Sequence, residues 1–112
     1  MEKTTHENFK AIKLRLAALA AAAPSIIGQF GKLSQTASAD GLVSSKVKEL
    51  TATAIAISKG CDDCVAYHVQ KSKQLGSTKD ELIEFVAVAI EMGGGPAVVY
   101  GAKALEYYEL AG

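Results

Sequence analysis

The chain has 112 residues, of which 49% are hydrophobic and 21% are charged, and its formal net charge is zero. This composition is too apolar for a disordered chain and fits a single globular domain, which we predict to cover residues 1–112. Twelve basic and twelve acidic residues cancel without forming a basic run, so nucleic acid is a poor candidate partner.

The longest apolar stretch, Leu16 to Ala23, is far shorter than the ~18 residues that a membrane-spanning helix needs. Its alanines and the following Pro24 loosely resemble a secretory signal, but Glu2 and Glu7 lie where such a signal carries basic residues. Two cysteines three positions apart also differ from a disulfide framework that joins distant segments. We therefore expect a cytoplasmic protein with no membrane partner.

Nearly every segment has the apolar spacing of a helix, and helix-ending residues fall between the segments. Abundant Ala, few aromatic residues and no Trp favour packed helices over a sheet. Pro24 and Pro96 suit the first turn of a helix, Gly60 suits a helix end, and Thr78 with Glu81 forms a capping-box pattern. The sequence predicts an all-α fold of about six helices, over residues 6–22, 24–36, 45–57, 61–75, 78–92 and 96–110.

Two of these helices have distinct apolar patterns. In the second, Ile26, Ile27, Phe30 and Leu33 follow the spacing of one apolar helix face. The third becomes uniformly apolar after Leu50, which predicts burial on all of its sides.

A pair of cysteines and a histidine mark the start of the fourth predicted helix. Because each helical residue turns by about 100°, Cys61, Cys64 and His68 are expected to project from one face. A thiolate that attacks a peroxide oxygen becomes a sulfenic acid, and a second thiol nearby condenses with it to a disulfide. A helix N-terminus and a neighbouring imidazolium both favour the thiolate. The spacing therefore predicts a thiol redox centre.

Two acids, Asp62 and Asp63, lie between the cysteines. They complement the helix dipole, but they oppose thiolate formation unless their carboxylates point away from the sulfurs. Helical spacing places them on the flank of the Cys/His face, so we expect the opposition to be partial.

Other interpretations of the motif account for less of it. A zinc site would need a fourth ligand, and His6 is the only other histidine. Haem attachment needs a histidine where the chain has Val65, and a thioredoxin domain needs strands that are not predicted. Buried structural cysteines with a hydrogen-bonded histidine stay open as an alternative. Glu49, taken by itself, is interpreted as a solvated acid in the first turn of the third helix.

At this point the residues resemble a known family. Glu49, followed twelve positions later by Cys61-x-x-Cys64-x-x-x-His68, resembles the signature of the alkyl hydroperoxidase D-like branch of the carboxymuconolactone decarboxylase superfamily. The resemblance covers about residues 24–110. Its flanking segments are Lys48-Glu49-Leu50, Ala66-Tyr67-His68, Leu75-Gly76 and Met92-Gly93-Gly94-Gly95-Pro96-Ala97.

The resemblance implies an all-α fold with the Cys-x-x-Cys at the start of the fourth helix, assembled as trimers or as hexamers. It implies a thiol-dependent peroxidase that acts on hydrogen peroxide or organic hydroperoxides and is restored by an external thiol or dithiol. Cys64 would be the peroxidatic thiol and Cys61 the resolving thiol, while Glu49 and His68 would form a proton relay. We predict no metal ion and no other cofactor.

One departure from the family pattern affects this expectation. The best-characterised branch carries a histidine directly before the second cysteine, where this chain has Asp63. A slower peroxidase or a different oxidant would follow. Two alternatives stay open: a redox-sensing or structural oligomer without catalysis, and a decarboxylase-type enzyme in which Glu49 and His68 handle protons.

Overall fold

The computed structural model describes residues 5–112, with side chains from Phe9 onward. It contains six helices: α1 (Thr5–Ala22), α2 (Pro24–Ser38), α3 (Ser45–Lys59), α4 (Asp62–Gln74), α5 (Lys79–Gly93) and α6 (Gly95–Leu110). The described residues form no strand. The all-α prediction is confirmed, and the ends of the predicted helices are shifted by no more than two residues.

The helix ends form where the sequence places their capping residues. Ser44 precedes α3, and its side chain accepts a hydrogen bond from the Val47 N–H. At the other end of α3, Gly60 has a φ of 69°, the left-handed conformation that costs a glycine little. Thr78 and Glu81 form the predicted capping box at the start of α5. The α3–α4 turn that carries Cys61 is therefore fixed by local signals.

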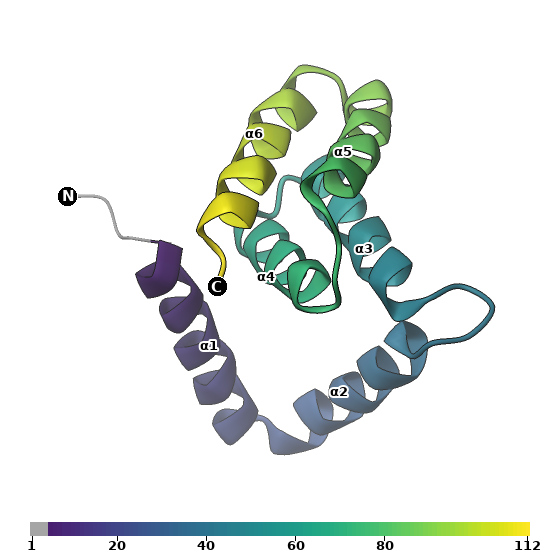
Figure 1. Cartoon of the computed structure of the whole chain (residues 1–112). Coiled ribbons are helices and arrows are strands. Elements are labelled where there is room, and N and C mark those ends of the chain that lie inside the picture. The colour runs from purple at the N-terminus through teal and green to yellow at the C-terminus, as the bar shows by residue number, and fades with distance from the viewer. Residues whose placement is uncertain (1–4) are drawn as a thin grey trace.

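Helices α3 to α6 pack against one another (Figure 1), and their buried side chains belong to one apolar core. Its largest fully buried apolar side chains are those of Leu50, Ile57, Val65, Val69 and Leu82. Helix α6 approaches α5 closely at Gly101, where a Cβ would lie 2.8 Å from the Val86 Cγ1 atom. This packing holds α4, and with it the Cys-x-x-Cys, between α3 and α6.

Helices α1 and α2 form an arm that extends from this core (Figure 1). Phe9 and Ile12 of α1 are buried against the core, whereas α2 contacts only α1 and α3 and buries no residue. Phe30 is 64% exposed and Leu33 is 63% exposed. The periodicity thus predicts the helix correctly, but the chain itself does not cover its apolar face.

The expectation that α3 is buried on all sides is wrong. Thr53, Ala56 and Ile57 face the core, but Ile55 is 53% exposed. It lies in an open groove between α3 and α5 together with apolar side chains of α5. A run of apolar residues rules out a polar helix face, but it does not require every side of the helix to be covered, and Ile55 faces the open groove.

Over residues 5–112, no helix combines the length and the apolar composition that crossing a membrane requires.

Candidate functional site

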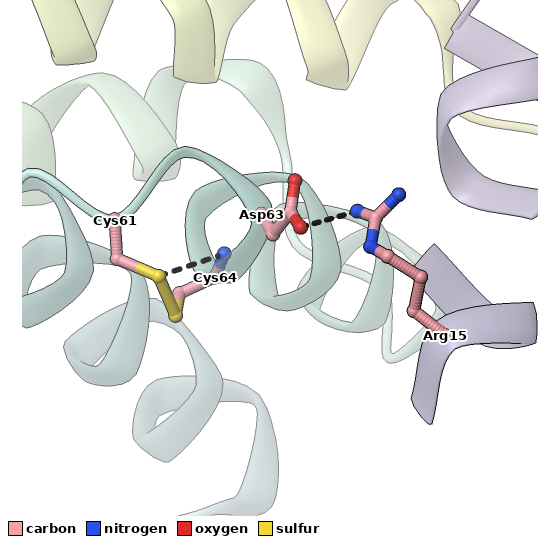
Figure 2. Close-up of a disulfide and its surroundings, with 4 residues drawn as sticks. All are labelled: Arg15, Cys61, Asp63 and Cys64. Carbon is pink, nitrogen blue, oxygen red and sulfur yellow. Dashed lines mark hydrogen bonds and ion pairs between the residues drawn. A yellow bond between two sulfur atoms is a disulfide. The ribbon is translucent and has the colours of Figure 1, made fainter. Parts of the chain in front are cut away.

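The two cysteines are joined by a disulfide at the start of α4 (Figure 2). Cys61 is the N-cap residue of the helix, and its Sγ accepts a hydrogen bond of 3.3 Å from the Cys64 N–H. The Cα atoms are 5.2 Å apart, within the usual range for a disulfide. Cys61 therefore lies just before the first helical turn and caps it, so the three-residue spacing brings the sulfurs together without placing both on regular helix.

Glu49 and His68 form the second contact of the site. The Glu49 carboxylate lies 2.7 Å from the His68 Nδ1 atom and joins α3 to α4. Glu49 is only 4% exposed, so its interpretation as a solvated first-turn acid is wrong. It faces α4 because positions 49, 53 and 56 form the buried side of α3. A buried carboxylate requires such a partner, because leaving the charge unpaired would be costly.

The disulfide and the Glu49–His68 pair lie on the same α3–α4 hairpin, but they are separate contacts. His68 follows Cys64 by one helical turn, and its Nδ1 atom is occupied by Glu49, which leaves Nε2 for another group. Between described residues, no hydrogen bond joins the His68 ring to either sulfur. Of the four predicted site residues, Cys61 thus pairs with Cys64, and Glu49 pairs with His68.

The first motif acid, Asp62, is bound by α6. The Tyr107 hydroxyl donates a 2.5 Å hydrogen bond to Asp62 Oδ1, and the Lys103 Nζ atom lies 3.6 Å from Oδ2. Burial, and then the hydrogen bond to Asp62, raise the pKa of Tyr107 above its ordinary value of 10.0, so the hydroxyl remains a donor. Tyr107 is itself buried and packs against Phe9 of α1.

The second motif acid, Asp63, forms an ion pair with Arg15 of α1. Figure 2 shows the Asp63 carboxylate directed toward Arg15, on the side of the turn away from the disulfide. Side chains from other helices therefore explain why the two acids flank the sulfurs, because each carboxylate is bound by such a side chain. Arg15, Lys103 and Tyr107 were not predicted, because neither α1 nor α6 carries a motif that signals these contacts.

Residues 24–107 match the sequence model of the carboxymuconolactone decarboxylase family. The chain belongs to this family. The Glu49, Cys-x-x-Cys and His68 pattern is consistent with its alkyl hydroperoxidase D-like branch.

Several relatives have similar sequences and folds. A structure of a carboxymuconolactone decarboxylase family protein from Legionella pneumophila, in its apo form, superposes with a TM-score of 0.90 at 38% identity, over 94% of each chain. A family protein from Thermotoga maritima shares the fold, with a TM-score of 0.80 over 90% of this chain and 86% of its own, at 24% identity. An uncharacterized protein from Cupriavidus necator is 41% identical over 98 residues, which are 88% of this chain and 87% of that protein. Protein 4 of the cox locus of Paracoccus denitrificans is 36% identical over 84 residues, covering 75% and 76% of the two chains.

A cysteine pair at this spacing can also serve as a pair of metal ligands. The described part of this family member contains no group of three or more His, Cys, Asp or Glu side chains that could hold a metal ion. His6, the other histidine, has a side chain outside the described residues.

Proposed function

We propose that the chain is a thiol-dependent peroxidase that reduces hydrogen peroxide or organic hydroperoxides through a Cys61–Cys64 dithiol/disulfide cycle. The observation that carries this proposal is the disulfide at the start of α4, on the same helical hairpin as the buried Glu49–His68 pair. In its reduced, dithiol form the cysteine pair supplies two electrons, and the Glu49–His68 pair supplies a place for a proton.

The proposed oxidation proceeds in two balanced steps. The Cys64 thiolate attacks one peroxide oxygen, the O–O bond breaks, and the protein keeps a sulfenic acid while an alcohol or water leaves with one added proton. The Cys61 thiolate then attacks the Cys64 sulfur, and the hydroxyl leaves as water when the disulfide forms. An external thiol or dithiol reduces this disulfide and restores both cysteines.

Glu49 and His68 are proposed to move the protons of these steps. Glu49 orients the imidazole through Nδ1, so Nε2 is the nitrogen that can take the Cys64 proton and return it to the leaving oxygen. The distance of 2.7 Å and the burial of Glu49 support this role, because a carboxylate excluded from water strengthens the base that it orients.

The position of Cys61 supports its role as the resolving thiol. Its Sγ accepts the Cys64 N–H at the N-terminus of α4, where a thiolate is stabilised by the helix dipole and by that hydrogen bond. A thiolate at this position is placed to attack the sulfenic acid of Cys64. It is also a good leaving group when a reductant attacks Cys64.

A stoichiometric test of the reduced protein examines this proposal. One equivalent of hydrogen peroxide should convert both thiols to the Cys61–Cys64 disulfide, as measured by intact mass after alkylation, and turnover should continue with a dithiol donor. Cys64→Ser should abolish turnover, whereas Cys61→Ser should leave a sulfenic acid that dimedone traps.

Other results would assign the site differently. Thiols that stay unchanged after peroxide would contradict the peroxidase, and a disulfide that forms once without turnover would identify a redox sensor. Decarboxylase-type activity that survives a Cys61→Ala, Cys64→Ala double change would show that the cysteines are incidental.

We also propose that the protein functions as a homo-oligomer, a trimer or a hexamer, in which a second copy covers the arm. Helix α2 carries one charged residue, Lys32, and is otherwise small, apolar or uncharged polar. A large exposed apolar surface, such as the one formed by the side chains that follow, is typical of a protein interface. Six large apolar side chains of the arm are each more than half exposed: Leu14, Leu16, Leu19, Ile26, Phe30 and Leu33.

Light scattering after size exclusion tests this assembly. We expect the wild-type chain to be oligomeric and Phe30→Glu to dissociate it, while the neighbouring control Gln29→Glu leaves it assembled. A monomeric wild-type protein, or equal dissociation by both variants, would contradict the proposed interface.

A further inference from the structure

We propose that Arg15 is a positioning residue of the redox centre: its guanidinium holds the Asp63 carboxylate away from the sulfurs and offsets its charge. The inference deepens the proposed peroxidase function and rests on one part of it, namely that Cys64 reacts as a thiolate. It also means that the packing of α1 on the core affects the charge around Cys64, because α1 carries Arg15.

The need for such a residue follows from the place of Asp63. It directly precedes Cys64, so their Cα atoms are about 3.8 Å apart, which is shorter than the ~8–10 Å screening length. An uncompensated carboxylate at this distance disfavours the thiolate. Asp62 has the same problem and is compensated by Lys103 and Tyr107 of α6. Arg15 performs the matching task for Asp63.

The packing of α1 delivers Arg15 to this position. Among the side chains of α1 that the structure describes, those of Phe9 and Ile12 are buried, and the Phe9 ring lies 6.2 Å from the ring of Tyr107. Arg15 follows Ile12 by three residues, so it projects from the same face of the helix one turn later. In the described chain, Arg15 alone forms an ion pair with Asp63. Lys13 on the same helix lines a different groove, beside Gln70 and Leu110.

The exposure of the pair sets the size of the effect. The Arg15 and Asp63 side chains are 57% and 56% exposed, so water and salt screen their charges. We therefore expect removal of Arg15 to slow thiolate reactions at neutral pH by about two- to five-fold, and we expect high salt to reduce this difference.

A double-mutant cycle in a Cys61→Ser background, where Cys64 is the single thiol, tests the inference. The readout is the iodoacetamide alkylation rate as a function of pH. Arg15→Gln should shift the midpoint to higher pH and slow the neutral rate by about two- to five-fold. Asp63→Asn should not slow it, and Arg15→Gln should have no further effect once Asp63 is Asn. Arg15→Lys should restore the wild-type profile, and the charge-matched control Lys13→Gln should leave it unchanged.

Three results would overturn the role of Arg15. These are an unchanged profile for Arg15→Gln, an equal loss for Lys13→Gln, or the same slowing by Arg15→Gln when Asp63 is already Asn. Alkylation consumes no peroxide, so failure of this inference is distinct from failure of the proposed peroxidase activity. Thermal unfolding of each variant separates a charge effect from a change in folding.

Discussion

The Glu49–His68 pair supports a quantitative prediction for Glu49→Gln. The amide keeps the shape of the side chain and can still accept a hydrogen bond from Nδ1, but it removes the charge. A hydrogen bond to an ionised group contributes about 1.5–3 kcal/mol, against about 1 kcal/mol for a neutral one. If the imidazolium forms in the rate-determining step, the difference of about 0.5–2 kcal/mol corresponds to about a 2- to 30-fold slower reaction, since each 1.4 kcal/mol is a factor of ten.

The assay is a single turnover of the reduced protein with peroxide, in which formation of the Cys61–Cys64 disulfide is followed by quenched alkylation and mass. Glu84→Gln provides a matched control, because Glu84 is an exposed acid on α5. We expect the control to react at the wild-type rate. A Glu49→Gln protein that keeps its fold and reacts at the same rate as the Glu84→Gln control would refute the proton relay.

Two further predictions concern stability. Gly101→Ala should lower the free energy of unfolding by about 1–2 kcal/mol, because overpacking against α5 outweighs the gain in helix propensity. Gly28→Ala, where nothing lies within 4 Å of the new Cβ, should instead raise it by about 0.5–1 kcal/mol; chemical denaturation measures both, and equal effects would contradict the packing argument. The raised pKa of Tyr107 predicts that stability is fully present below pH 10.0 and falls as pH rises above it, because the unfolded chain then loses a proton that the folded chain keeps. Thermal unfolding from pH 9 to 11.5 should show this decline in the wild type and a shallower one in Tyr107→Phe.

The helices were predictable because their signals are local. Ser44, Gly60 and the Thr78–Glu81 box act on backbone groups within one turn, and the structure uses each of them as a cap. The Cys61–Cys64 disulfide was also accessible from spacing, since three residues at a helix start bring two sulfurs together.

The burial of particular faces was less predictable. The apolar face of α2 and the apolar run around Ile55 in α3 both indicate helices. Periodicity does not say, however, which apolar face meets another helix of the same chain. Glu49 illustrates the converse. Its burial depends on the angle between α3 and α4, and only resemblance to a family pointed to a role for it.

The sequence by itself determined six helices, their caps and a thiol pair at the start of the fourth, because these depend on interactions between residues a few positions apart. Tertiary structure alone decided that Glu49 meets His68, that Tyr107 binds Asp62, and that Arg15 reaches Asp63 across 48 positions. Such contacts depend on how whole helices pack, and packing is set by the combined fit of many side chains. Tertiary packing therefore determines the electrostatic surroundings of the cysteines, whereas the local sequence motif determines the cysteine pair itself.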